Sequence, residues 1–456
     1  MRESLPDSAI PTEAGSSQSR LARALFAGGV LTIGLDQYRP LLGSVGNLSD
    51  LLFGAAFTLG ACMWFARVDS RRLSNLLHAI RRSEPLIWGG VLLTAGGAIA
   101  SLGSAAPSPS WRVTLKYFTM FCLWLPWVTV TVEQYLPVAS ALVLYVAGFC
   151  LIALSTFLDL FLGTGFGGRL VSTPGYEVNF DNLSEGLRYG GPTGHPNTLG
   201  YVSAIGFLIC LSAIIGGKGR RVFAPLLGFL ACGGAVLISG SRAAFLGAVV
   251  GGLVLLGLSN PMGRRRLLLV SAVSLCALWN TSSSVAFRSA ANPVERLLES
   301  VQPHRSFDAD WQRARDLRLV QRLLSHDPVT GYGMEDIGTA APPTKVAFNL
   351  PHFIVLQSWV AGGVLALLGT LWLYVATLRL GWTAVREGQS IAPGLFASCV
   401  AFILMDMVHP GLDQRFKWFA AALIIATLHS SRRSSRSAGI SGSREPDSPW
   451  SNLGRA

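Results

Sequence analysis

Residues 136–162 read LPVASALVLYVAGFCLIALSTFLDLFL, a run of 27 residues in which Asp159 is the only charged side chain. About 20 apolar residues in a helix cross the ~30 Å hydrocarbon core of a bilayer, so this stretch predicts a transmembrane helix. Similar runs recur along the chain, which is 50% hydrophobic and only 14% charged, with mean hydropathy +0.45. Soluble domains carry about a quarter charged residues. We therefore expect an all-α polytopic membrane protein.

The apolar runs predict about twelve transmembrane helices. They form a bundle over residues 21–430, between a disordered leader at 1–20 and a disordered tail at 431–456. Two long loops, 163–197 and 285–351, interrupt the bundle on its outer side, and the second is expected to contain short helices. The expected spans are 21–37, 48–66, 85–104, 112–132, 136–162, 198–216, 222–239, 243–259, 266–284, 352–378, 391–408 and 415–430.

Basic residues set the expected direction of the chain. With the N-terminus inside, the short outer connections 105–111 and 409–414 hold no Lys or Arg, and 38–47 holds only Arg39. The positive-inside rule then predicts a cytoplasmic-membrane protein with both termini in the cytoplasm. The net charge of +12 follows from the same bias, and we expect no nucleic-acid partner. The basic residues assigned to inner loops are Arg67, Arg71, Arg72, Arg81, Arg82, Lys218, Arg220, Arg221, Arg264, Arg265, Arg266, Arg379 and Arg386, with the tail arginines.

The seven cysteines all lie in apolar runs. Cysteine in such a run is usually a small packing residue. We therefore expect no disulfide framework, no metal and no cofactor.

The first outer loop ends in RYGGPTGHPNTLG, residues 188–200. Asn197, next to a proline and just before an apolar run, is a plausible N-cap of the following helix. The glycines allow a tight backbone path close to a ligand. His195 fits a functional role and a simple loop-to-helix junction equally well.

A short turn, Ser239-Gly240-Ser241-Arg242, joins two expected spans at the outer surface. Its backbone should be nearly fixed by both helices, and the two serines and the glycine leave Arg242 uncrowded. A guanidinium group matches phosphate oxygens, so Arg242 is a candidate for binding a phosphate group. The alternative is an arginine that extends to lipid headgroups.

The second outer loop is the longest polar interruption of the chain. A short helix is expected over 292–301, and a second one from about Asp308 or Asp310 to Ser325. The second helix places an apolar and a basic set of side chains on different faces. It either lies on the membrane with a solvated basic face or helps to hold an anionic, lipid-linked substrate. The apolar set is Trp311, Ala314, Leu317, Val320 and Leu324, and the basic set is Arg315, Arg318 and Arg322.

The loop closes on Asn349-Leu350-Pro351-His352, at the start of an expected span. An imidazole at this place can accept a proton from a hydroxyl group near neutral pH. A lone histidine at a membrane surface is more often structural, so His352 is a candidate general base only in combination with other groups.

In order and spacing, these features resemble the O-antigen ligase and polymerase family. The similar features are Arg188-x-x-Gly…His195-Pro-Asn-x-Leu-Gly, the Ser241-Arg242 turn, the Trp311 helix followed by Asp327-Pro…Gly331-Tyr-Gly, and His352 before Gly362-Gly363. The resemblance covers about Arg188 to Gly369.

The resemblance implies a C-type glycosyltransferase fold that takes a glycan from undecaprenyl pyrophosphate at the outer membrane face. By position, Arg242 and His352 match two functional residues of the family. A third, a loop arginine one turn before the tryptophan, falls on Phe307 here, so Arg305 is taken as the nearest candidate. Phe353 also replaces the residue that usually follows the histidine.

From these residues we expect a metal-independent, inverting transfer. Catalytic candidates are Arg242, Arg305 and His352, with His352 acting on the acceptor hydroxyl. Substrate-binding candidates are Arg188, His195, Asn197, Arg313, Arg315 and Arg318.

The expected partners are an undecaprenyl-pyrophosphate-linked glycan donor, a glycan or lipid-core acceptor, membrane lipids and a chain-length regulator protein. Polymerase and ligase both remain open. A transporter or flippase is the main alternative, although Asp36, Asp159, Asp406 and His409 lie near span ends rather than centres. A non-catalytic scaffold of a polysaccharide assembly complex is a third possibility.

Overall fold

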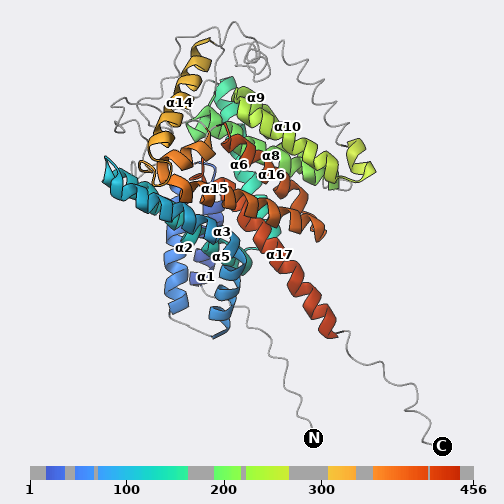
Figure 1. Cartoon of the computed structure of the whole chain (residues 1–456). Helices are drawn as coiled ribbons and strands as arrows, with labels where there is room; N and C mark the ends of the chain where they lie inside the picture. Colours follow the sequence, from blue (N-terminus) through green and yellow to red (C-terminus); the bar gives the residue numbers. More distant parts are fainter. Residues whose placement is uncertain are drawn as a thin grey trace, which may run out of the picture.

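Figure 1 shows the computed structural model of the chain. It describes residues 17–35, 47–65, 70–162, 189–216, 222–266, 307–334, 353–408 and 411–441. Within these ranges all regular secondary structure is helical, and no strand is present. The prediction of an all-helical protein therefore holds for the described part of the chain.

The described helices have the following bounds along the chain. They are α1 (Ser17–Leu31), α2 (Leu48–Phe65), α3 (Ser70–Gly103), α4 (Pro107–Phe118), η2 (Thr119–Trp124), α5 (Leu125–Tyr135), α6 (Val138–Leu162), η4 (Gly191–Thr193), α8 (Pro196–Gly216), α9 (Phe223–Ile238), α10 (Arg242–Leu258), α14 (Phe307–His326), α15 (Ile354–Arg386), α16 (Ala392–Asp406) and α17 (Arg415–Ser441).

Several helices are long and apolar enough to cross a bilayer, so the protein is a multi-pass membrane protein. Among the described residues these candidate spans are Ile80–Gly103, Pro107–Val132, Val138–Asp159, Pro196–Gly216 and Ile354–Arg386. Shorter apolar helices cover Leu48–Cys62, Phe223–Ile238, Arg242–Leu258 and Ala392–Asp406. The total of about twelve spans and the direction of the chain stay predictions. The expected span 266–284 and the expected helix 292–301 lie outside the described residues.

Two helices run past the predicted ends of the bundle. α1 begins at Ser17, inside the stretch expected to be a leader, and α17 continues to Ser441, beyond the expected boundary at residue 430. A helix that has already been nucleated extends at little cost through residues of moderate propensity such as Ser and Arg. The apolar residues of the sequence therefore predict where a membrane segment lies, but they do not predict where its helix begins or ends.

The expected span 112–132 is a continuous helix with one wide turn. α4 and α5 are joined by the π-helical turn η2, directly before Pro126. Proline has no backbone N–H and so cannot donate to the carbonyl one turn earlier. A π turn is a common way to absorb such a local mismatch without breaking the helix.

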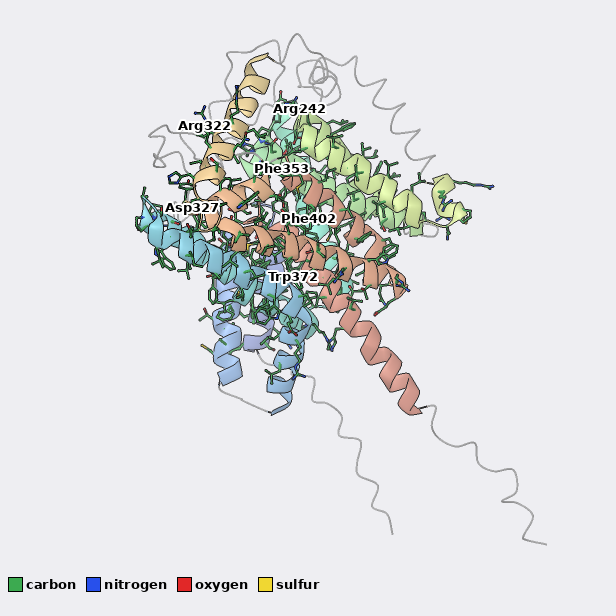
Figure 2. All side chains as sticks on the ribbon, in the orientation of Figure 1. Arg242, Arg322, Asp327, Phe353, Trp372 and Phe402 are labelled. Carbon is green, nitrogen blue, oxygen red and sulfur yellow. The ribbon has the colours of Figure 1, made fainter. Side chains whose placement is uncertain are left out.

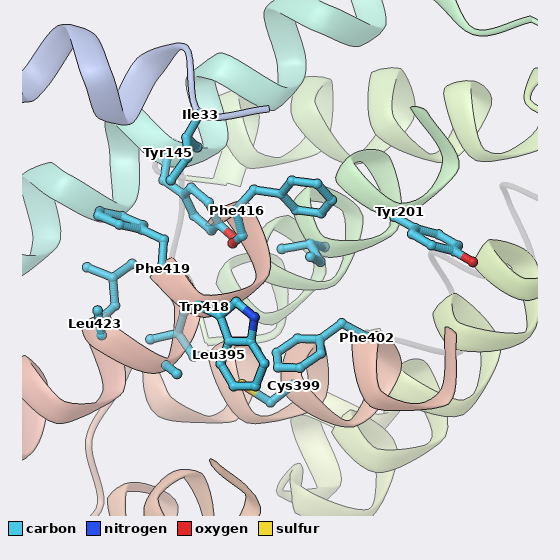
Figure 3. Packing of buried hydrophobic residues seen from close by; sticks show 14 of the residues in the cluster. Ile33, Tyr145, Tyr201, Leu395, Cys399, Phe402, Phe416, Trp418, Phe419 and Leu423 are labelled. Atoms are coloured by element: carbon cyan, nitrogen blue, oxygen red, sulfur yellow. The ribbon is translucent and has the colours of Figure 1, made fainter. Parts of the chain in front are cut away.

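α17 forms the centre of the hydrophobic core (Figure 3). Every side chain from Phe416 to Leu428 is buried. Trp418 meets Phe121 of η2 edge to face, with ring centroids 4.8 Å apart, and Tyr145 of α6 donates a hydrogen bond to the Phe416 carbonyl. The first half of α17, from Phe416 to Leu428, is therefore enclosed by the other helices.

α8 is the most enclosed of the candidate spans. In its most apolar window 72% of the residues are buried, against 39–50% in the other candidate spans. It packs against α6, α9, α10 and α16, which lie around it in Figure 1. The thiols of Cys210 in α8 and Cys150 in α6 meet at Gly228 of α9, where a Cβ would lie 2.7 Å from the first and 3.0 Å from the second. The six described cysteines form no disulfide.

α3 and α15 pack closely along a seam of glycines. A Cβ at Gly96 would lie 2.5 Å from the Gly362 carbonyl oxygen, and one at Gly369 would lie 2.7 Å from the Gly89 carbonyl oxygen. Small residues let two helix backbones approach within a membrane, where dispersion contacts replace the hydrophobic effect as the driving force. This seam fixes α15 along most of its length.

We expect Gly369→Ala to lower the stability of the folded protein by about 1–3 kcal/mol, the usual cost of overpacking. The new methyl group would meet backbone atoms of α3, which cannot rotate away. The measurement is thermal unfolding of the purified protein in detergent.

Gly252→Ala is the matched control because a Cβ at Gly252, in α10, meets nothing within 4 Å. Helix propensity alone should make this variant equal to or slightly more stable than the parent. Equal losses in the two variants would contradict the close approach of α3 and α15.

Candidate functional site

α8 begins with a histidine cap. His195 Nδ1 accepts a hydrogen bond from the Asn197 backbone N–H (3.1 Å), and the His195 carbonyl accepts the first intrahelical bond, from Leu199 (3.0 Å). These are the two bonds that define an N-cap residue. The expectation that Asn197 caps the helix is therefore wrong by two positions, because Pro196 already occupies the first helical position. In a neutral imidazole this arrangement leaves the proton on Nε2.

The chain reaches this cap through a tight turn that needs glycine. Gly191 and Gly194 have φ of 50° and 72°, in the left-handed region. A Cβ at Gly191 would overlap the Thr156 hydroxyl of α6. The Thr193 hydroxyl donates to the Gly190 carbonyl (2.6 Å) and closes the turn. The glycines in this stretch thus serve close packing against α6 and backbone conformation.

Arg242 is the first residue of α10 and is half-buried. Ser241 caps the helix, since its hydroxyl accepts from the Ala244 N–H (3.4 Å), and Ser239 accepts from the Ser241 N–H (3.2 Å). Gly240 takes φ of 57°, which permits the reversal. The predicted short turn between two helices, with Arg242 directly after it, is present, and the place of Arg242 at the outer membrane surface stays a prediction.

The beginning of α8 and the turn before α10 are in direct contact. A Cβ at Gly200 would lie 2.7 Å from Ala244 Cβ and 2.8 Å from the Ser239 hydroxyl. The Tyr189 N–H also donates to the carbonyl of Ile238, the last residue of α9 (3.2 Å). Two stretches that are about forty residues apart in the chain therefore form one junction, which we call the α8–α10 junction.

α14 closely matches the helix expected between Asp308 and Ser325. It packs on α15 through Val320 and Leu323, which are buried against Val360. Leu317, expected on the apolar face, is 60% exposed and belongs to the outer side of the helix. The buried stripe of α14 is thus shifted toward Leu323, because this side of the helix packs on α15. Arg318 is exposed on α14, as expected for a basic face.

After α14 the chain turns around Asp327. Its carboxylate accepts from the Val329 N–H (3.2 Å), from the Thr330 N–H (3.0 Å) and from the Thr330 hydroxyl. Partial burial raises the pKa of Asp327, but these hydrogen bonds outweigh it, so that the pKa lies below its ordinary value. The ionised carboxylate therefore stabilises the turn.

The segment after this turn fills a break in α15. Gly363 has φ of 69° and interrupts the helix. The Tyr332 and Gly333 N–H groups donate to the carbonyls of Val360 and Ala361 (3.0 and 2.9 Å), and Val329 accepts from the Val364 N–H (3.1 Å). The backbone N–H and C=O groups of α15 that lose their helical partners at Gly363 thus form hydrogen bonds with residues 329–333. Buried backbone groups need such partners. We call this arrangement the loop–helix lock.

Glycine is required on both sides of the lock. A Cβ at Gly331 would lie 2.5 Å from the Gly363 nitrogen, and a Cβ at Gly363 would overlap the Val329 carbonyl. The Gly-Tyr-Gly and Gly-Gly sequences, which the resemblance treated as separate signatures, are therefore two halves of one contact.

Arg242, Arg322 and Phe353 lie toward the same end of the molecule, while Trp372 lies deeper along α15 (Figure 2). His195 and Asn197 lie at the beginning of α8 and Arg242 is the first residue of α10, so they flank the α8–α10 junction from its two sides, and Arg318 is on α14. Arg188, Arg305 and His352 lie outside the described residues, and so do the side chains of Arg313 and Arg315. Within the described ranges, no group of three or more His, Cys, Asp or Glu side chains could hold a metal ion.

The sequence analysis missed one polar group close to this junction. Lys417 and Asp406 form an ion pair in which both side chains are completely buried. Asp406 was set aside because it lies at a span end, and Lys417 was not singled out. A lysine within the otherwise apolar stretch 416–428 was the signal that could have identified the pair.

Comparison with known proteins gives one family. Residues 227–371 match the family described as O-antigen ligase. The match begins in α9, spans Arg242, α14 and the loop–helix lock, and ends in α15. No curated protein matches the chain.

We expect Asp327→Ala to weaken the turn by about 1 kcal/mol, the usual value of a hydrogen bond, and so to speed amide exchange at Val329 and Thr330 roughly fivefold at pH 7. Asp327→Asn keeps an acceptor oxygen and should retain most of the protection. Hydrogen–deuterium exchange measures the rates of these two amides in both variants. Equal rates in Asp327→Ala and Asp327→Asn would contradict the role of the Asp327 side chain as their hydrogen-bond acceptor.

The parent turn should also depend on pH. Its folded-state pKa lies below the unfolded value of about 3.9. The stabilisation is therefore fully present above that value and is lost as pH falls through the folded-state pKa. In Asp327→Asn the same amides should lose no additional protection in acid.

Proposed function

We infer that this membrane protein is a glycosyltransferase of the O-antigen ligase and polymerase family. The basis is the match of residues 227–371 to the O-antigen ligase family. Our specific proposal is that it transfers a glycan from undecaprenyl pyrophosphate to a sugar hydroxyl at the outer face of the cytoplasmic membrane. The observation that supports it most is the α8–α10 junction, which holds Arg242 at the start of a helix within the matched region.

Arg242 is suited to bind a pyrophosphate. The N-terminus of a helix carries partial positive charge and unpaired N–H groups. A guanidinium at the same place adds a permanent charge and a fork that pairs with two phosphate oxygens. The capped turn before α10 keeps the backbone of Arg242 in place before substrate arrives, which lowers the cost of organising the site.

In the proposed reaction the acceptor hydroxyl oxygen attacks the anomeric carbon of the donor. The bond from that carbon to the pyrophosphate oxygen breaks, and undecaprenyl pyrophosphate leaves with the electron pair. Arg242 and Arg305 stabilise the negative charge that develops on the leaving group. His352 takes the proton from the acceptor hydroxyl. A single displacement inverts the configuration at carbon, and no metal ion is assigned a role.

The remaining polar candidates are proposed to bind the substrates. Arg188 and the basic residues of α14, Arg313, Arg315 and Arg318, are proposed to contact the donor phosphates. His195 and Asn197 hold the start of α8 and are proposed to contact the substrate from this place.

A second lipid-linked glycan as acceptor would make the enzyme a polymerase, and a lipid core would make it a ligase. A chain-length regulator and a flippase encoded beside the gene would favour the polymerase.

We expect Arg242→Ala to reduce glycan transfer by about 10²–10³-fold, the usual effect of removing one donor to a developing oxyanion. Arg242→Lys should recover only part of the loss, because lysine keeps the charge without the fork. His352→Ala should also reduce transfer strongly. The readout is surface polysaccharide in a strain that lacks the chromosomal gene, with membrane expression measured in parallel.

The control is Arg264→Ala, which removes an exposed arginine beyond the opposite end of α10. It should leave transfer unchanged. Normal polysaccharide from either Arg242→Ala or His352→Ala, at normal expression, would rule out the proposed roles. Transport of a lipid-linked glycan by the reconstituted protein, without transfer, would favour a flippase.

Gly200→Ala should lower transfer at least tenfold, because the new methyl group would press on Ala244 and displace the turn that carries Arg242. Displacements of about 1 Å can cost 10²-fold in rate. Gly216→Ala, at the other end of α8, is the matched control, since a Cβ there meets nothing within 4 Å. The same polysaccharide assay compares the two, and equal activity would contradict the importance of the α8–α10 junction.

A further inference from the structure

The buried ion pair between Lys417 and Asp406 is embedded in a network of four helices. Lys417 of α17 donates to Asp406 of α16 and to the Gly411 carbonyl (3.4 Å). The Tyr374 hydroxyl of α15 donates to the second oxygen of Asp406 (2.9 Å). The ammonium group also lies 4.8 Å from the ring centroid of Tyr201 in α8, which Figure 3 shows among the buried residues of the core.

Such a pair is not explained by stability alone. Removing two charges from water costs several kcal/mol for each ion, and well-packed apolar side chains in their place are often as stable or more so. Hydrogen bonds from Tyr374 and to Gly411 satisfy part of the pair, and the π face of Tyr201 adds a weaker attraction. A fully buried pair of this kind is better explained by a requirement for one particular arrangement of the helices.

A chain of contacts connects the Lys417–Asp406 pair to the α8–α10 junction. The Tyr201 hydroxyl donates to the Met405 carbonyl (3.3 Å), next to Asp406. Tyr201 directly follows Gly200, the residue that contacts the turn before Arg242. Met405 also touches α10, where a Cβ at Gly247 would lie 2.9 Å from its side chain. α8 and α10 are therefore both held against the same end of α16.

We propose that Lys417 and Asp406 are positioning residues, which hold Tyr201 and the first turns of α8 so that the α8–α10 junction presents Arg242 in its working place. The pair touches no substrate in this account. The proposal rests on the proposed function for its effect on transfer, but its effect on geometry can be measured independently of any substrate.

The decisive variant replaces both charges, as Lys417→Met with Asp406→Asn. Methionine fills the space of the lysine stem, and asparagine still accepts from Tyr374. We expect thermal unfolding in detergent close to the parent and surface polysaccharide reduced at least tenfold. In an Arg242→Cys background, we expect the rate at which a charged methanethiosulfonate reagent modifies that position to change at least threefold, read by mass spectrometry.

The matched control is Lys116→Met, which breaks the half-exposed pair between Lys116 and Asp413. It should leave unfolding, polysaccharide and modification rate unchanged, as is usual for exposed pairs. A double-charge variant that keeps both the parental modification rate and normal polysaccharide would overturn the proposal. If the parent transfers no glycan at all, the proposed function fails, and the modification rate still decides the positioning role.

A second set of variants covers the case in which the double-charge variant does not fold. Tyr201→Phe keeps the ring under the ammonium group, whereas Tyr201→Leu removes it, and both lose the hydroxyl. We expect a rate changed at least threefold in Tyr201→Leu and a smaller change in Tyr201→Phe, which loses only the hydrogen bond to the Met405 carbonyl. A parental rate in Tyr201→Leu would overturn the proposal.

Discussion

Inside a bilayer, every backbone N–H and C=O must find a partner within the protein, because neither water nor lipid tails can supply one. A helix meets this condition by itself until it is interrupted. In α15 the interruption at Gly363 is repaired by backbone groups of residues 329–333, which donate and accept at the broken turn. The first turns of α15, up to the break at Gly363, are therefore held by the segment after α14.

The same condition explains where polar side chains are tolerated. The serines of the turn before α10 pair with backbone groups at a helix end, where four N–H groups would otherwise be unsatisfied. Lys417 and Asp406 are tolerated deep in the core because each compensates the other and Tyr374 completes the set. The two groups lie at a helix end and at a junction between helices, and a charged substrate could be bound at such places.

Close packing makes these junctions sensitive to single methyl groups. Gly200, Gly363 and Gly369 each face backbone or short side-chain atoms that cannot move aside. In a membrane such contacts supply much of the attraction between helices. The geometry of the proposed pyrophosphate site is therefore set by small residues around it as much as by Arg242 itself.

The sequence alone determined the class of the protein and two local elements of the candidate site. Apolar runs of bilayer length specify helices because hydrocarbon admits little else, and the Ser-Arg turn and the helix of the second loop were visible from local signals. The family match over residues 227–371 confirms the part of the resemblance that follows residue 226, and the features from Arg188 to Gly200 stay a prediction.

Only the tertiary structure decided which local signals belong together. It placed His195, rather than Asn197, as the cap of α8, and it shifted the buried stripe of α14 from Leu317 to Leu323. It also joined Gly331 to Gly363 and Lys417 to Asp406. Caps depend on the path of the preceding chain, and burial depends on the partner helix. Pairing between distant residues depends on how helices pack, and none of these is encoded in the periodicity of one segment.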